Sequence, residues 1–227
     1  MAERGGQLIA SVLIANRGEI AVRLIRTYRA LGVRTVAVYS DADAGALHVR
    51  LADQAIRIGL PPVTESYLNS AALIAAADES GAKAVDPGYG LLSENPGFAR
   101  AVRAAGLIFI GPPSEAIAVM GDKPAAHAVA RRAGVPVVPS SGVITSAEQA
   151  EQEAARLGYP VVVKASFGGG GRGMRVVADA AGLAAALTAA GAEAAAAFGR
   201  GEVYLERHVP APATSRCRCW PIPTAPC

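Results

Sequence analysis

Short apolar runs alternate with helical patterns along the first half of the chain. Buried strands are predicted at residues 11–15, 35–40, 54–59, 84–88 and 107–111. Helices are predicted after the first strand, where Ile20, Leu24, Ile25 and Leu31 recur at helical spacing, near His48, at residues 68–81 and from Asn95. Strands that alternate with helices indicate a mostly parallel sheet with right-handed crossovers. We therefore expect a Rossmann-like α/β layout for roughly residues 8–112, within a first domain at residues 1–112.

The pattern changes after the break at Gly111 to Pro113, where Ser114 and Glu115 are typical of a helix start. A helical pair follows, and then a helix at residues 145–158. Two strand-like runs, PVVVKAS and MRVVAD, flank a glycine-rich loop, and an alanine-rich helix leads to a last strand, EVYLERHV. We expect residues 113–212 to form a second domain of helices and a small antiparallel sheet.

Composition narrows the classes of partner. The 227 residues are 52% hydrophobic, and the net charge of +3 comes from scattered arginines rather than a basic block. Aromatic residues are few, so we expect no nucleic-acid partner. We expect no apolar run to reach the roughly 18 residues that a membrane helix needs, and therefore no membrane span.

The N-terminus and the cysteines bear on localisation. Arg4 followed by LIASVLIA resembles a signal peptide, but the run is short and continues into a helical pattern, which favours a strand, a turn and a helix. The first 216 residues contain no cysteine, which fits a reducing cytosol. We expect a cytoplasmic protein.

The glycine loop, KASFGGGGRGM at residues 164–174, is the first candidate for chemistry. Successive glycines let backbone N–H groups approach a ligand closely, and such concave nests favour polyphosphate oxygens. Lys164 closes an apolar strand at the loop, Arg172 adds a fork of donors, and Lys123 supplies a second cation. The lysine precedes the glycines, unlike in a P-loop, and Gly18 stands alone where a dinucleotide fingerprint needs three glycines. A flexible hairpin tip with a solvated arginine is the alternative.

Several motifs in order then resemble one family. IANRGEIAVRLIR, PGYGLLSEN, IGPPSEAIAVMGDK, GYPVVVKAS and GGGGRGMRVV are similar to the successive motifs of biotin carboxylase, the ATP-grasp component of acetyl-, propionyl- and methylcrotonyl-CoA carboxylases and of pyruvate carboxylase. The resemblance covers about residues 8–212. It implies a pre-ATP-grasp domain followed by a partial ATP-grasp domain, which consists of a helical pair and a lid with a small antiparallel sheet.

The resemblance implies ATP-dependent carboxylation of biotin on a carrier protein. Bicarbonate and ATP give carboxyphosphate, which delivers carbon dioxide to the ureido nitrogen of biotin. The implied cofactors and substrates are ATP, Mg²⁺ or Mn²⁺, bicarbonate and carrier-bound biotin. The implied partners are a biotin carboxyl carrier protein or domain, a carboxyltransferase and a second copy of the chain.

By position in the motifs, the resemblance implies a set of ATP-binding residues. Lys123 and Lys164 match the phosphate lysines, and Met174 matches the lid residue near adenine. The lid loop matches Gly168, Gly169, Gly170 and Gly171. The hinge strand that reads the adenine edge matches Glu206, Arg207, His208 and Val209. Outside the family, a lone histidine such as His208 on a strand is more often half-buried structure.

The first domain carries the implied biotin and bicarbonate side of the cleft, at Tyr89 and Glu94 in PGYGLLSEN. The chain departs from the family there, since Asp86 and Leu91 stand where the family usually has histidine and phenylalanine. Phe167 stands where some members have a further glycine, and a bulky residue limits conformations with positive φ.

The last residues differ in composition, because all three cysteines and the only tryptophan lie within ATSRCRCWPIPTAPC. A zinc site is disfavoured by the C-x-C spacing, and a disulfide-bearing or proline-rich tail is the plainer alternative. Reverse translation with a shift of one nucleotide gives RHVEVQVLADTHGTV, which resembles the strand after the hinge in biotin carboxylases. We expect that one nucleotide was lost near the Pro212 codon and that residues 213–227 are out of frame.

This expectation limits the activity of the chain. The magnesium-binding glutamates, the general base and the bicarbonate arginine of the family would lie beyond the matched part, so we expect no catalytic residue and no metal ligand here. The truncated chain is expected to be inactive alone. Two alternatives stay open: another ATP-grasp ligase such as a carbamoyl-phosphate synthetase, and a nonenzymatic ATP-binding module.

Overall fold

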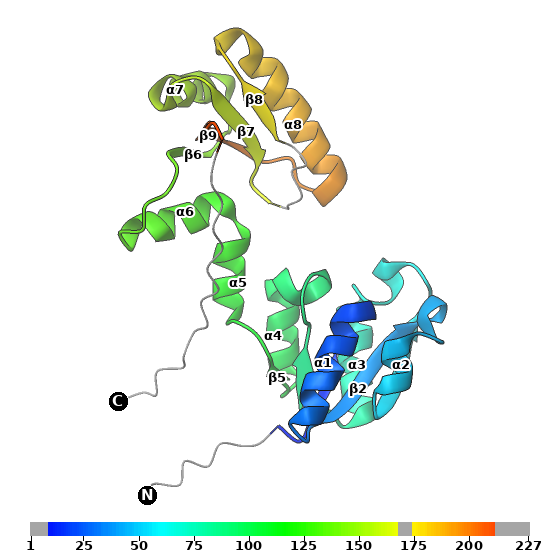
Figure 1. The fold of residues 1–227 in the computed structure, drawn as a ribbon. Helices are drawn as coiled ribbons and strands as arrows, with labels where there is room; N and C mark the ends of the chain where they lie inside the picture. Colours follow the sequence, from blue (N-terminus) through cyan, green and yellow to red (C-terminus); the bar gives the residue numbers. More distant parts are fainter. Residues whose placement is uncertain (1–8, 168–173, 212–227) are drawn as a thin grey trace, which may run out of the picture. The chain divides into compact units, whose positions relative to one another are not determined.

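The computed structural model describes residues 9–167 and 174–211. Two compact units divide between Ala118 and Val119, inside helix α5 (Ser114–Gly121). Figure 1 shows both units, which are described separately below. The division lies slightly later along the chain than the sequence-based boundary at residues 112 and 113.

The first unit is built on a five-stranded parallel sheet. Its strands are β1 (Ser11–Ile14), β2 (Arg34–Ser40), β3 (Gln54–Gly59), β4 (Ala84–Asp86) and β5 (Ile108–Phe109), in the order β3-β2-β1-β4-β5. All four pairings are parallel, as the alternation of strands and helices predicted. The strand order reverses between β1 and β4, and ligands of open α/β sheets commonly bind beyond the carboxyl ends of such strands.

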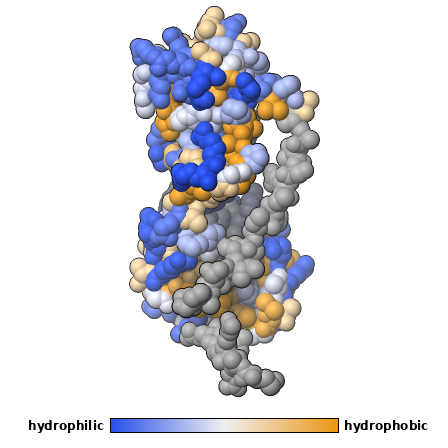
Figure 2. All heavy atoms as spheres, turned by 90° about the vertical axis from the view of Figure 1, so that its left-hand side faces the viewer, coloured by the Kyte–Doolittle hydropathy of each residue, from blue (hydrophilic) through white to orange (hydrophobic). Residues whose placement is uncertain are grey.

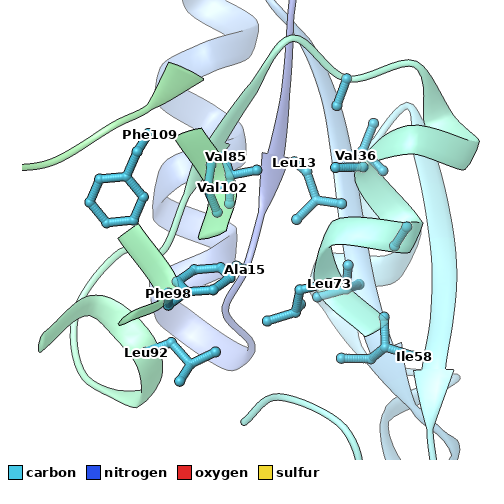
Figure 3. Packing of buried hydrophobic residues seen from close by; sticks show 14 of the residues in the cluster. Leu13, Ala15, Val36, Ile58, Leu73, Val85, Leu92, Phe98, Val102 and Phe109 are labelled. Carbon is cyan, nitrogen blue, oxygen red and sulfur yellow. The ribbon is translucent and has the colours of Figure 1, made fainter. Parts of the chain in front are cut away.

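Helices bury both faces of this sheet. They are α1 (Gly18–Ala30), α2 (Leu47–Leu51), α3 (Ser70–Ser80) and α4 (Pro96–Ala104), and short 3₁₀ turns lie at Asp41–Asp43, Val63–Glu65 and Leu91–Glu94. Leu13 packs with Leu73 of α3 and Phe98 of α4, as Figure 3 shows. Its neighbour Ile14 packs on the other face with Ile25 of α1. Each such fully buried side chain contributes roughly 1.5–3 kcal/mol.

The second unit contains a four-stranded antiparallel sheet in the order β6-β9-β7-β8. Its elements after α5 are α6 (Lys123–Arg132), β6 (Ser140–Val143), α7 (Ala147–Leu157), β7 (Val161–Ala165), β8 (Arg175–Val177), a 3₁₀ turn (Ala180–Gly182), α8 (Leu183–Phe198) and β9 (Val203–Arg207). The hairpin of β7 and β8 is confirmed. Strand β6 was not predicted, because Ser-Ser-Gly has no strand-like pattern; it forms by pairing with β9.

Helices α7 and α8 pack on one face of the antiparallel sheet. The core between them contains Leu157 of α7, Leu183 of α8 and the inward-facing Val161, Val163 and Leu205 of the strands. In Figure 1, α8 runs alongside β7 and β8. Because a strand alternates its side chains between two faces, every second residue of β7 and β9 faces away from these helices.

One helical stretch, Ala180–Ala197, is long enough and apolar enough to cross a membrane by length and composition, with a mean hydropathy of 1.3. The expectation that no run reaches this length was wrong. Part of this stretch packs on the sheet, since Leu183 is 2% exposed and Ala190 is fully buried, but only 22% of the stretch is buried. Figure 2 shows hydrophobic and hydrophilic residues interspersed on the face that it draws, as on most protein surfaces in contact with water.

Candidate functional site

The face of the antiparallel sheet opposite α7 and α8 carries a cluster of polar side chains. In β7, Val163 lies in the helix-covered core, so its neighbour Lys164 points to the opposite face. In β9, Leu205 is in the core, and Tyr204 and Glu206 point away from it. The strand register pairs Lys164 directly with Tyr204. The pleat of two adjacent strands therefore brings these three polar side chains together.

Lys164 and Glu206 form an ion pair between Nζ and Oε1, and the Tyr204 hydroxyl donates to Oε2 of Glu206 at 3.3 Å. The pair is poorly hydrated, because the side chains of Lys164 and Glu206 are 25% and 12% exposed. Burial and the neighbouring charge of Glu206 raise the pKa of Tyr204 well above its usual range, so the phenol stays protonated and donates. The cluster can present a cation and a carboxylate to a ligand from one rigid sheet.

The second predicted lysine lies at the start of α6. Asp122 caps this helix, since its carboxylate accepts from the backbone N–H of Ala125 at 3.0 Å. The backbone N–H of Lys123 donates to the carbonyl of Ser166 at 3.3 Å. The N-terminus of α6 is thus joined to the segment that follows β7, so Lys123 and Lys164 both lie next to the start of the glycine loop.

The loop itself lies mostly outside the described residues, including Gly168, Gly169, Gly170, Gly171 and Arg172. Its first described neighbour, Phe167, lies under the guanidinium of Arg200 at 3.7 Å from the ring centroid, a cation–π contact. Arg200 also donates to Glu202 at 2.7 Å and lowers the pKa of that carboxyl. Phe167, which stands where some family members have glycine, therefore packs against a specific residue, Arg200.

The other predicted hinge and lid residues lie in different environments. Arg207 points toward α7, where its Nε donates to the carbonyl of Leu157 at 3.0 Å, on the face opposite Glu206. The backbone N–H of His208 donates to the carbonyl of Pro160. Met174 and Val209 are 48% and 44% exposed. The structure brings together Lys164 and Glu206, and it places the Arg207 side chain away from them.

In the first unit, the carboxyl edge of the sheet holds the loop that carries Tyr89. Asn16, which follows β1 and is 2% exposed, donates through Nδ2 to the carbonyls of Pro87 at 2.7 Å and Tyr89 at 2.9 Å. Gly88 has φ +64°, and a Cβ there would lie 2.8 Å from Ile20. The loop is therefore fixed tightly against the start of α1, and Tyr89 is displayed with 73% of its surface exposed.

Asp86 makes two contacts at the same edge. Its carboxylate accepts from the backbone N–H of Gly88 at 2.8 Å and from the hydroxyl of Tyr28 at 2.6 Å. Burial, and then the hydrogen bond and charge of Asp86, raise the pKa of Tyr28. Glu94 is exposed at the end of the 3₁₀ turn that begins at Leu91, a residue with φ of 47°. Asp86, which stands where the family usually has histidine, is therefore held by a hydrogen bond from Tyr28 of α1.

The residues that the structure describes contain no group of three or more His, Cys, Asp or Glu side chains placed to hold a metal ion. The predictions for residues 213–227, including the three cysteines and the shifted reading frame, concern residues outside the described part of the chain. Sequence reasoning missed the contacts of Tyr204, His127 and Asn16. Asn16 lies in the motif IANRGEIAVRLIR, but the motif alone does not show which backbone groups it binds.

Two protein families match the chain, one in each unit. Biotin carboxylase, N-terminal domain, matches residues 8–117. Carbamoyl-phosphate synthase L chain, ATP binding domain, matches residues 122–214. Together, the two matches relate the chain to a family of ATP-dependent ligases.

Relatives narrow this class further. The chain is 51% identical over 205 residues to methylcrotonoyl-CoA carboxylase subunit alpha, mitochondrial, of Oryza sativa subsp. japonica, covering 90% of this chain and 28% of that protein. It is 51% identical over 207 residues to biotin carboxylase of Allochromatium vinosum, covering 90% of this chain and 46% of that protein. The chain thus spans about half, or less, of the length of the curated relatives it matches.

Solved structures agree with these relatives. A biotin carboxylase complex with β,γ-ATP from Campylobacter jejuni matches with a TM-score of 0.85 and 49% identity, over 88% of this chain and 45% of that chain. The biotin carboxylase domain dimer of Hydrogenobacter thermophilus 2-oxoglutarate carboxylase, in complex with MgADP, ADP and bicarbonate, matches with a TM-score of 0.87 and 46% identity, over 90% and 45% of the two chains. The chain belongs to the biotin carboxylase family.

Proposed function

We propose that the chain provides the N-terminal domain and part of the nucleotide site of a biotin carboxylase, which carboxylates carrier-bound biotin with ATP and bicarbonate. The observation that carries this proposal is the pairing of Lys164 with Glu206 on the sheet face that α7 and α8 leave uncovered. A cation and a carboxylate fixed side by side suit a ligand with anionic phosphates and a base that donates hydrogen bonds.

In the proposed site, Lys164 and Lys123 neutralise phosphate oxygens. Phosphoryl transfer depends mainly on such clamps, which position and neutralise oxygens, and the glycine loop adds backbone donors. Glu206 accepts from the amino group of adenine, and the exposed Val209 follows two residues after the end of the same strand, β9. We assign Arg207 and His208 only through their backbone, since the Arg207 side chain points to Leu157.

The proposed biotin and bicarbonate side lies at the carboxyl edge of the parallel sheet, where Tyr89 is displayed and Glu94 is exposed. The proposed partners are a biotin carboxyl carrier protein or domain, a carboxyltransferase and a second copy of the chain. The dimeric, bicarbonate-bound domain of 2-oxoglutarate carboxylase supports the last of these and the substrate. A chain free of cysteine in its first 216 residues suits the cytoplasm.

The divalent metal of the reaction does not fit the residues that the structure describes, because they contain no cluster of ligands for it. Mg²⁺ needs carboxylate oxygens together with substrate phosphates. We therefore derive no step through the metal and assign no catalytic residue within residues 9–167 and 174–211.

A second candidate function, that of a carbamoyl-phosphate synthetase-like ligase, is favoured by the family that matches residues 122–214. The match of residues 8–117 to the biotin carboxylase N-terminal domain supports the first function instead. ATP turnover that depends on biotin, measured in a protein that contains this chain and the remainder of the ATP-binding domain, distinguishes the two. Turnover that requires bicarbonate and ammonia or glutamine but no biotin favours the second.

Binding of ATP to the 227-residue chain tests the nucleotide site directly. We expect Lys164→Gln to weaken ATP binding at least about tenfold in calorimetric titration, because a poorly hydrated charge contact to phosphate is lost. Lys83→Gln is the matched control, since Lys83 is an exposed lysine of the first unit and its loss leaves affinity unchanged. Equal affinity of the Lys164 variant and the original chain contradicts the proposed site.

A further inference from the structure

Tyr204 is one of the largest fully buried side chains of the second unit, with 1% of its surface exposed. Its position in β9 directs it to the sheet face that carries Lys164, not to the apolar core under α7 and α8. Its hydroxyl donates to Oε2 of Glu206 at 3.3 Å. A buried tyrosine normally has a partner for its hydroxyl, and here the partner is the carboxylate of the proposed base site.

Glu206 is consequently held from two sides. Lys164 binds Oε1 and Tyr204 donates to Oε2. A carboxylate has about four lone-pair positions, so two contacts orient it and leave acceptor positions for a ligand. A carboxylate held this way favours a base whose edge donates, such as the amino group of adenine. It disfavours a base with a carbonyl oxygen at the same position, such as guanine, because two acceptors then face each other without a proton.

Tyr204 is itself fixed by residues of two further elements. The ring of His127, on α6, meets the ring of Tyr204 edge to face, with centroids 6.1 Å apart and an angle of 86° between the planes. Nδ1 of His127 is 3.0 Å from Oγ of Ser140 on β6. The contacts form one continuous series from Ser140 through His127 and Tyr204 to Glu206.

We propose that Tyr204, supported by His127, is a positioning residue that orients Glu206 and thereby makes the nucleotide site selective for adenine over guanine. This inference rests on the proposed nucleotide-binding function. Neither residue belongs to the motifs that the resemblance rests on, and neither touches the phosphates in the proposed site. Their effect is confined to the base and reaches it through Glu206.

A residue that only fills the core would change ligand binding in a different way. Loss of packing weakens the binding of every ligand of the second unit, whereas loss of Glu206 orientation weakens only ligands that carry a base. Binding of ATP, GTP and inorganic tripolyphosphate to the full 227-residue chain separates the two effects, because tripolyphosphate has no base.

The variant Tyr204→Phe removes only the hydroxyl. We expect its ATP affinity to fall about five- to tenfold, the loss of one hydrogen bond to a charged group, with tripolyphosphate affinity unchanged and the preference for ATP over GTP reduced by the same factor. Tyr67→Phe is the matched control, because Tyr67 is a fully buried tyrosine of the first unit whose hydroxyl donates to Asp43 at 2.7 Å. Its ATP to GTP ratio stays at the original value.

Each other outcome has a definite meaning. Binding of neither ATP nor tripolyphosphate by the original chain contradicts the proposed function itself. If the original chain binds ATP and Tyr204→Phe binds it equally well, or loses ATP and tripolyphosphate affinity in equal measure, the positioning role is overturned and the nucleotide site stands. Should Tyr204→Phe fail to fold, His127→Ala decides: a reduced ATP to GTP ratio supports the inference, and an unchanged ratio overturns it.

Discussion

The two sheets of this chain differ in how much of their surface is used for packing. The parallel sheet has helices on both faces, so consecutive residues of β1 such as Leu13 and Ile14 are both fully buried. The antiparallel sheet has α7 and α8 on one face only, and consecutive residues of β8 differ: Val177 is 3% exposed and Val176 is 61% exposed. Parallel sheets are generally buried on both sides, whereas antiparallel sheets often are not.

This difference explains where polar chemistry is found in each unit. In the parallel unit, Asn16, Asp86 and Tyr89 all lie at the carboxyl edge, since the faces have no room for a ligand. In the antiparallel unit, Lys164 and Glu206 lie on the face itself. Functional residues at a sheet edge lie on loops, and buried side chains must hold the backbone of these loops in place. Functional residues on a sheet face lie on the strands, so the pairing of the strands already determines their positions.

The largest effect is expected from truncation in the doubly covered sheet. Leu13→Ala and Ile14→Ala should each lower the free energy of unfolding of the parallel unit by about 2–5 kcal/mol, because each leaves a cavity under a different helix layer. Urea unfolding, with hydrogen exchange of the strand amides to assign the unit, measures this. Leu31, 69% exposed, provides the control, since Leu31→Ala should change stability by less than about 0.5 kcal/mol.

In the antiparallel sheet, the matching prediction is that truncation of the two adjacent valines of β8 has unequal effects on stability. Val177→Ala should cost about 1.5–3 kcal/mol, from two lost methyl groups and a cavity, and Val176→Ala should cost almost nothing. Equal losses at Val176 and Val177 would show that the second face of the antiparallel sheet is covered at β8 too, and the contrast between the units would fail.

The edge of the parallel sheet is tested by two glycines that have nearly the same φ. Gly81 and Gly88 have φ of +65° and +64°, but a Cβ at Gly81 meets nothing within 4 Å, whereas one at Gly88 lies 2.8 Å from Ile20 and 3.1 Å from Asn16. Gly81→Ala should cost about 1 kcal/mol from backbone strain alone, and Gly88→Ala about 2–3 kcal/mol. Thermal unfolding measures both, and equal costs would contradict a tightly held Tyr89 loop.

A smaller effect is expected from pH in the parallel unit. His48 is 1% exposed; its Nε2 is 3.2 Å from the carbonyl of Val38, and its Nδ1 has no partner among the described residues. Burial lowers the pKa of His48 below its ordinary 6.5, although Asp43 opposes this shift. The unfolded chain therefore binds the proton more readily, and this contribution to stability is complete above about pH 6.5 and declines as pH falls below it.

The measurement compares urea midpoints at pH 7 and pH 5.5. We expect the original chain to lose up to about 1 kcal/mol between these values, and His48→Gln to lose less, because it has no proton to gain. Asp43, whose pKa is lowered by hydrogen bonds from Tyr67 and Ser40 against the effect of burial, contributes in a separate window, below about pH 3.8. A pH dependence that His48→Gln leaves intact would assign the effect to another group.

Much of the fold could be predicted from pattern alone. The parallel strands are continuous apolar runs bounded by turn residues, and the helices have clear starts, such as Asn95 before Pro96 and Ser146 before α7. Strand β6 escaped prediction because its residues have no strand propensity and form a strand only beside β9. The alanine-rich helix was predicted, but its stretch Ala180–Ala197 was wrongly taken as too short in apolar residues to reach 18, because alanine is a weakly apolar residue whose contribution adds up only over the whole length of the helix.

The site was predictable in part. Lys164 stands out because a lysine closes three valines, and Lys123 and Glu206 came from the resemblance to a family. The contacts of Asn16 with Pro87 and of His127 with Tyr204 could not be predicted, because the partners lie at distant positions in the sequence. Tyr204 is two residues from Glu206, but only the strand pleat shows that both side chains share one face. The roles of these residues, like those of the glycine loop, stay predictions until binding is measured.

The sequence by itself determined the α/β class of the fold, the order of most of its helices and strands, and the family. Periodicity and motif order are local properties, and they are readable without knowing which strands are neighbours. Only the tertiary structure decided which face of the antiparallel sheet lies opposite α7 and α8, that Lys164 and Glu206 share it, and that Arg207 does not. The physical reason is the pleat: adjacent residues of a strand point to opposite faces, so a side chain's partners depend on register and on which face the helices bury.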